Sequence, residues 1–326
     1  DLFKGGSNGD GKGERIPCPY CPEQLGSDQQ AIFSVNINSL SPGGFPRDVT
    51  LRDKDWNVRV VPAYRPVFRI ETPLRREPRR LHDVMKAPGA HEKIILSATH
   101  GEAIWDLSAR RIELVWHVLR HRMVNLYRDP RLGHQYAYMV FGHHVGGLYS
   151  HAVLNLTASP FVPRKVRREL DGAHKWYAIK ERCLLSDIYE EEIYKRDRGK
   201  PHGIIFESKN FIALIPFFAA HPFETWILPL DHYSDFTQTP VSFMPELARV
   251  TLRVIAALKK CLGPFPFIIS QMNQPNEAWG VNRGYWKTLD RDWLWRLRIV
   301  PDLPLADSPY QAFNNGTGVR LNPVFP

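Results

Sequence analysis

The stretch HEKIILSATHGEAIWDLS, residues 91–108, decides the fold, because its apolar part recurs later in the chain. IILSATH at 94–100 aligns without a gap with WILPLDH at 226–232, and both copies are apolar strands that end on a histidine. Alternating segments that end in proline precede the two copies, at 56–66 and 210–222. This repetition at matching places predicts an internal duplication.

Each copy is followed by apolar residues spaced three and four apart, at 108–127 and 245–262, and this spacing predicts an amphipathic helix in each half. Ser108 is a suitable N-cap for the first helix. Further strands are predicted at 136–144 and 152–156 in the first half, and at 265–271 and 293–301 in the second. Strands that arrive in adjacent pairs favour an α+β fold with an antiparallel sheet and packed helices.

Three segments follow from this pattern. A helical connector is predicted over 171–193, which places the boundary between the halves near residue 172. We therefore expect a flexible glycine-rich lead-in at 1–15, a first repeat at 16–172 and a second repeat at 173–326.

Composition excludes some classes of protein. The 326 residues are 43% hydrophobic, which is enough for a large core, yet no run of eighteen apolar residues predicts a membrane span. No secretory leader is recognisable, so we infer a cytoplasmic protein. The net charge of +9 comes largely from arginine-rich runs at 74–82 and 163–170. Neither run is interleaved with aromatic residues, so we interpret both as solvated helix faces or loops, and nucleic-acid binding is not predicted.

Two of the four cysteines, Cys18 and Cys21, have the spacing of a metal site. Zinc prefers four thiolate or imidazole ligands in a tetrahedron, so two histidines would complete the site. His100 ends one predicted strand and His151 begins another, and strand ends meet at one edge of a sheet. These two are the best-placed partners among the 13 histidines.

Six blocks of the sequence together resemble, in order, the galactose-1-phosphate uridylyltransferase family of the histidine-triad superfamily. The blocks are CPYCPE (18–23), WNVRVVP (56–62), LHDVMKAPGAHEKIILSATH (81–100), VFGHHVGGLYSHAVLNLTASPFVP (140–163), ALIPFFAAHPFETWILPLDH (213–232) and NNGTGVRLNPVFP (314–326). Relatives of this family include nucleotide-sugar and dinucleoside-polyphosphate phosphorylases. The resemblance implies two histidine-triad-like repeats, a nucleotidyltransferase ancestry, a homodimer, and structural zinc on Cys18, Cys21, His100 and His151.

The same resemblance implies a missing nucleophile. In the family a motif of histidine, proline, histidine, any residue and glutamine carries the nucleotide on its second histidine. Counted back from the shared PFVP, the frame here is HAVLN at 151–155, with Val153 at the nucleophile's place and Asn155 in place of the glutamine. Valine has no lone pair, so covalent transfer at this position is excluded. A register with His151 as nucleophile is disfavoured because it removes a zinc ligand.

Arg296 and Arg298 stand where relatives carry a second metal site, which we therefore expect to be lost. They alternate with Leu297 on one predicted strand, so both side chains lie on the same face. One interpretation is a fixed positive charge that binds an anionic ligand or an acidic partner. The other is an ion pair with Asp290 or Asp292.

Three functions remain open from the sequence. The first is a zinc-stabilised protein that is catalytically silent or reprogrammed and still binds a nucleotide, a sugar phosphate or a protein partner, with Asn155, Arg296 and Arg298 as substrate contacts. The second is an active transferase, phosphorylase or hydrolase that uses another residue, such as His143, His144 or Tyr149. The third is a structural subunit of a larger assembly. Likeness of fold alone does not choose between them.

Overall fold

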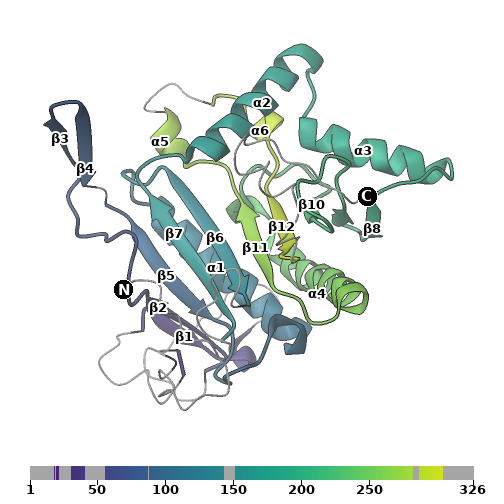
Figure 1. Ribbon diagram of the computed structural model, residues 1–326, viewed down its shortest axis with the longest axis horizontal. Coiled ribbons are helices and arrows are strands. Elements are labelled where there is room, and N and C mark those ends of the chain that lie inside the picture. The colour runs from purple at the N-terminus through teal and green to yellow at the C-terminus, as the bar shows by residue number, and fades with distance from the viewer. Residues whose placement is uncertain are drawn as a thin grey trace.

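The computed structural model describes residues 18, 20–21, 31–40, 56–86, 88–142, 151–281 and 286–303. Its centre is a ten-stranded sheet in which neighbouring strands are antiparallel (Figure 1). In sheet order the strands are β1 (Phe33–Val35), β2 (Val58–Pro62), β5 (Ala90–Ile95), β7 (Val153–Ser159), β6 (His134–Phe141), β11 (Phe267–Met272), β12 (Arg296–Pro301), β10 (Thr225–Pro229), β9 (Phe211–Leu214) and β8 (Ile204–Glu207). The predicted α+β fold with an antiparallel sheet is confirmed.

The two ends of the sheet come from different parts of the chain. Strands β1, β2, β5, β7 and β6 precede residue 160, strands β8 to β12 follow residue 203, and the two sets meet where β6 pairs with β11. The predicted boundary near residue 172 lies inside helix α2 (Arg164–Lys180), which leads from one set to the other. The division into two repeats stays a prediction.

Two long helices cover one face of the sheet. They are α1 (Ala109–Tyr127) and α4 (Met244–Leu262), close to the predicted ranges, and they pack against each other behind the sheet in Figure 1. The hydroxyl of Ser108 accepts a hydrogen bond from the backbone N–H of Arg111 at 3.2 Å, as expected of an N-cap. Leu154, Leu156 and other alternate strand residues are buried against these helices in the largest apolar cluster.

The opposite face is covered mainly over β9 and β10. There α2, α3 (Leu184–Asp197) and α6 (Leu289–Asp292) bury a second apolar cluster that includes Leu214, Trp226 and Leu228. The connector predicted as one helix over 171–193 is two helices, because Glu181 adopts a left-handed conformation with φ 54° and ends α2. A short helix, α5 (Glu277–Val281), follows β11.

The arginine-rich run at 74–82 forms neither a helix face nor a loop. It builds most of a hairpin of β3 (Arg75–Arg79) and β4 (His82–Lys86), which projects from the body of the protein (Figure 1). Most of its residues are exposed, including Leu81 at 94%. Since neither face is buried, the run shows no alternation of apolar and polar residues by which a strand is recognised.

Buried polar groups join the two sets of strands near the β6–β11 contact. The Asn273 side-chain amide donates to the Tyr127 hydroxyl at 2.6 Å and to the Asp235 carboxylate at 3.0 Å. The Tyr127 hydroxyl donates to the backbone carbonyl of Gln274 at 3.2 Å. Burial raises the pKa of both Tyr127 and Asp235. Helix α1 is thereby tied to the second half of the chain.

Several predicted features lie outside the described residues: the lead-in at 1–15, the block at 314–326, His143, His144 and Tyr149. Among the described residues, no helix combines the length and the apolar character needed to cross a membrane.

Candidate functional site

Four predicted metal ligands are close together at one end of the sheet. Their ligand atoms, from Cys18, Cys21, His100 and His151, all lie within 4.8 Å of one another. His100 follows β5 and His151 precedes β7, and because these strands are antiparallel neighbours, the two histidines meet at the same edge. Cys18 and Cys21 are held on a turn closed by a hydrogen bond from the Cys21 N–H to the Cys18 carbonyl at 3.2 Å.

The distances between these atoms fit a tetrahedral centre. The Cys21 Sγ lies 3.3 Å from His100 Nδ1 and 3.9 Å from His151 Nδ1, and the Cys18 Sγ lies 3.9 Å from His151 Nδ1. Zinc bonds of ordinary length would place sulfur and nitrogen about 3.6 Å apart. The other nitrogen of His151, Nε2, is 2.7 Å from the backbone carbonyl of Ser97, to which it can donate. This bond leaves the Nδ1 lone pair for a metal.

Val153, two residues beyond His151, lies in apolar surroundings. It is 8% exposed and belongs to a small cluster with Trp56, Val61 and Ile95. A side chain at this place that requires hydrogen bonds would meet hydrocarbon on several sides. The position that the resemblance assigns to the nucleophile is therefore packed to suit a valine.

We expect Val153→His to destabilise the protein by about 2 kcal/mol, because the imidazole would lose hydrogen bonds to water without replacing them. The control is Thr157→His, which places the same side chain at a half-buried position on the same strand face. Urea unfolding of both variants measures the difference. Equal costs would show that the Val153 surroundings accept a histidine.

A row of polar side chains crosses the same face of the sheet. Register pairs Lys93 of β5 with Asn155 of β7, Asn155 with Tyr138 of β6, Tyr138 with Ser270 of β11, and Ser270 with Arg298 of β12. We call these five residues the polar row. It lies between the apolar cluster around Val153 and the one under α2 and α3. Lys93 and Tyr138 are half-buried, which leaves part of each side chain accessible.

Asn155 connects its two neighbours in the polar row, Lys93 and Tyr138. Its Oδ1 accepts hydrogen bonds from Lys93 Nζ and from His91 Nε2, the latter at 3.4 Å, and its Nδ2 donates to the Tyr138 carbonyl at 3.1 Å. His91 Nδ1 accepts from the Val67 N–H at 3.3 Å, so Nε2 carries the proton. Burial, followed by the charge of Lys93, lowers the pKa of His91, which favours its neutral form.

The two arginines of β12 are paired with glutamates. Arg298 makes two bonds to the Glu224 carboxylate at 2.5 and 2.9 Å, and Arg296 bonds Glu169 at 2.6 Å. The observed partners differ from Asp290 and Asp292, the pair considered from the sequence. Each positive charge on this strand is matched by a carboxylate, so the positive surface predicted here is offset.

Arg296 is also enclosed by aromatic rings. Its guanidinium carbon lies 4.6 Å from the ring centroid of Trp226 and 5.2 Å from that of Trp293. Only 4% of the residue is exposed. Burial lowers the pKa of Arg296, although Glu169 opposes that shift. A ligand would have to displace protein groups to reach this side chain.

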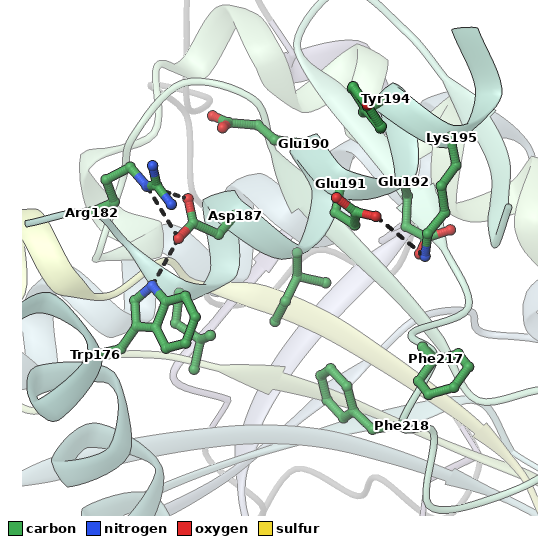
Figure 2. A pocket seen from close by; sticks show the side chains of 12 residues that line it. Trp176, Arg182, Asp187, Glu190, Glu191, Glu192, Tyr194, Lys195, Phe217 and Phe218 are labelled. Carbon is green, nitrogen blue, oxygen red and sulfur yellow. Dashed lines mark hydrogen bonds and ion pairs between the residues drawn. The ribbon is translucent and has the colours of Figure 1, made fainter. Parts of the chain in front are cut away.

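A shallow pocket of about 670 Å³ lies elsewhere, between α3 and the turn at 216–219 (Figure 2). Its aromatic lining includes Phe217 and Phe218, which are 74% and 58% exposed. Its charged lining residues are Asp187, Glu190, Glu191, Glu192, Arg182 and Lys195. Carboxylates outnumber cations, so the pocket repels a phosphate. The charge of this pocket therefore argues against it as a site for a phosphate-bearing ligand.

The sequence did not single out Lys93, His91, Glu169 or Glu224. A signal for the first two was present, since alternation places His91, Lys93 and Ile95 on one strand face. This signal could be interpreted only once the register between β5 and β7 was known. That register pairs Lys93 with Asn155, 62 residues away. The glutamates are 127 and 74 residues from their arginines, and helix packing and sheet order decide such pairs.

Comparison with known proteins gives a consistent result. No family model matches the chain. The chain is 24% identical over 314 residues to the ADP-glucose phosphorylase of Arabidopsis thaliana, an alignment that covers 95% of this chain and 79% of that protein. It is 24% identical over 188 residues to the galactose-1-phosphate uridylyltransferase of Thermotoga maritima, with 57% of each chain covered. For that second protein, the match spans little more than half of its length.

A solved structure extends this comparison to the fold. The crystal structure of an ADP-glucose phosphorylase from Arabidopsis thaliana with bound ADP-glucose matches with a TM-score of 0.75 and 23% identity. The match covers 96% of this chain and 89% of that one. The chain is therefore a relative of galactose-1-phosphate uridylyltransferases and ADP-glucose phosphorylases and shares their fold, which confirms the resemblance that the six sequence blocks predict.

Proposed function

We propose that this protein is a zinc-stabilised member of its group of relatives that binds a nucleoside-diphosphate sugar on the polar row and does not use a histidine at position 153 as nucleophile. The observation that carries the proposal is the polar row itself: a strip of hydrogen-bonding side chains on the sheet face opposite α1 and α4. A strip of this kind, bounded by apolar clusters, suits a ligand with a polar centre.

The chemistry of the row supports a nucleotide. Tyr136 and Tyr138 are stacked with ring centroids 5.2 Å apart, and half-buried aromatic rings can contact a base or a sugar. Lys93, on the other side of Asn155 from the two tyrosines, supplies positive charge for a phosphate. Bound ADP-glucose in the Arabidopsis structure supports the same class of ligand, because that protein shares the fold over most of both chains.

Of the three residues predicted to contact substrate, Asn155 and Arg298 lie in the polar row and remain proposed contacts. Asn155 acts mainly by holding Lys93, since both kinds of its polar atoms already have protein partners. Arg296 is enclosed by Trp226 and Trp293, so we assign it a role in the structure of this face.

Zinc is the metal that the four ligands suit best. Two thiolates and two imidazoles with tetrahedral spacing are typical of a closed structural zinc site, which keeps no position open for substrate. We therefore assign zinc to stability and the polar row to the ligand. The homodimer, the larger assembly and the cytoplasmic location stay predictions from the sequence.

Calorimetric titration of the zinc-loaded protein with ADP-glucose and UDP-glucose tests this function. We expect at least one to bind, and Tyr138→Ala to weaken binding about tenfold, since a stacked ring contributes on the order of 1 kcal/mol or more. The control Phe217→Ala removes an exposed ring from the acidic pocket and should leave affinity unchanged. The proposal fails if neither nucleotide sugar binds, or if the pocket variant is the one that loses affinity.

A further inference from the structure

Three buried or half-buried arginines near the sheet are paired with carboxylates, and Lys93 is not. Arg122 is paired with Glu92 at 2.6 Å, Arg296 with Glu169, and Arg298 with Glu224. Within the described part of the chain, no carboxylate lies within 4 Å of Lys93 Nζ, whose hydrogen-bond partner is the neutral Asn155 oxygen. A partly buried ammonium without a counter-charge is costly, so either an anionic ligand or loss of the proton relieves it.

Loss of the proton is within reach. Burial lowers the pKa of Lys93 to about 8. With that pKa, about a tenth of the side chain is neutral at pH 7 and about nine tenths at pH 9. The titratable groups on the same sheet face are His91 on its own strand, Tyr138 on β6, and Arg59 on β2, two residues before Val61, the register partner of Lys93. The Tyr20 ring lies 6.0 Å from Nζ. These neighbours include no carboxylate that would hold the proton.

The position of Lys93 suits an attack from the polar row. Its Cα pairs in register with Asn155, while Ile95, two residues on, pairs with Val153. Val153 and Asn155 are therefore about 7 Å apart along the same face of β7. The flexible four-carbon stem of a lysine spans that distance. The Lys93 amine can therefore reach the space beside Val153, the position at which the resemblance expects a nucleophile.

We propose that the Lys93 ε-amine takes the place of the missing histidine and carries the nucleotidyl group as a covalent nucleotidyl-lysine. This inference rests on the proposed function, because the nucleoside-diphosphate sugar must first bind on the polar row. The neutral amine attacks the α-phosphorus and forms a P–N bond. The bond from that phosphorus to the bridging oxygen breaks, sugar 1-phosphate leaves with its electron pair, and the nitrogen loses one proton to solvent.

Asn155 and His91 are the positioning residues for this step. The Asn155 amide is oriented by its Nδ2 bond to the Tyr138 carbonyl and by the proton that His91 Nε2 shares with Oδ1. Oδ1 therefore faces Nζ and accepts one of its protons, which leaves the nitrogen lone pair to point elsewhere. Asn155→Asp would place a carboxylate beside Nζ, raise the pKa of Lys93 and slow adduct formation at pH 7 at least fivefold.

The test uses the zinc-loaded full chain, incubated with ADP-glucose or UDP-glucose, followed by intact mass and peptide mapping. We expect a mass increase of one nucleotidyl group on Lys93, labile in acid and stable in alkali as a P–N bond requires. The rate of adduct formation should rise about tenfold from pH 7 to pH 9, because the neutral fraction of Lys93 rises by that factor.

Lys93→Arg keeps the positive charge and removes the nucleophile. It should bind the nucleotide sugar within about threefold of the native protein and form no adduct. Lys195→Arg changes a lysine that is already ion-paired with Glu192, and it should form the adduct at the native rate. This pair of variants separates the covalent role from general loss of charge.

Three results would overturn the inference: binding without any adduct, an adduct that persists in Lys93→Arg, or an adduct that maps to another residue. In each of these cases the proposed function survives, because the nucleotide sugar still binds. If neither nucleotide sugar binds in calorimetry, the proposed function fails and the lysine inference fails with it.

Discussion

Cys18→Ala is expected to lower the free energy of unfolding by about 5 kcal/mol, the largest effect of any single substitution considered for this protein. Structural zinc contributes on the order of 10 kcal/mol in small domains, and the apolar core here would retain part of the fold without it. Cys18 is buried and its sulfur lies within 4.8 Å of the other three ligand atoms. A chelator should produce the same loss in the native protein.

Metal content and urea unfolding, measured together, check this expectation. The native protein should carry one zinc per chain, and Cys18→Ala should carry much less than one. Cys261→Ala is the matched control, since that thiol is exposed on α4, and it should keep both zinc and stability. A Cys18 variant that loses its metal but unfolds at the native urea concentration would refute a structural role for the site.

Glu224→Gln is expected to cost about 3 kcal/mol, because it leaves the partly buried charge of Arg298 without its partner. Glu224 is 2% exposed, and its carboxylate accepts four hydrogen bonds: two from Arg298, one from Trp226 Nε1 at 2.9 Å and one from the Ala220 N–H at 3.2 Å. Burial alone would raise the pKa of Glu224, but the bonds from Arg298 hold it below its usual value.

The matched control is Glu77→Gln in the β3–β4 hairpin. Glu77 is paired with Arg75 at 3.1 Å, and the Arg75 side chain is 68% exposed, so solvent screens the pair and its loss should cost less than about 1 kcal/mol. Urea unfolding of the two variants gives the comparison. Equal losses would mean that Arg298 finds other compensation when Glu224 is neutralised.

Much of the fold follows from local patterns in the sequence. An apolar face against the core is present in strands β5, β10, β11 and β12, and a broad apolar stripe in helices α1 and α4. The spacing of apolar residues in the sequence therefore predicts these elements. The hairpin at 75–86 buries neither face and leaves no such pattern. The break between α2 and α3 depends on the left-handed conformation of Glu181, a residue type that rarely adopts it.

The site residues also separate into those that the local sequence predicts and those that depend on contacts between distant segments. The cluster of two cysteines and two histidines was predictable, because a Cys-x-x-Cys pair and histidines at strand ends carry their own signal. The role proposed for Lys93 depends on a neighbour 62 residues away and on the lack of a nearby carboxylate among the described residues, and neither can be recognised from the local sequence. The partners of Arg296 and Arg298 likewise depend on where α2 and the turn before β10 pack.

The β6–β11 pairing makes the sheet a single hydrogen-bonded unit across the middle of the chain. If the chain were cut near residue 200, each fragment would present an unpaired strand from the centre of the sheet, β6 with Met139 or β11 with Ile269. Such an edge is a template for pairing with any other chain. Complementation between two co-expressed fragments, or domain swapping between two copies, would therefore occur at this strand pair before any other place in the sheet.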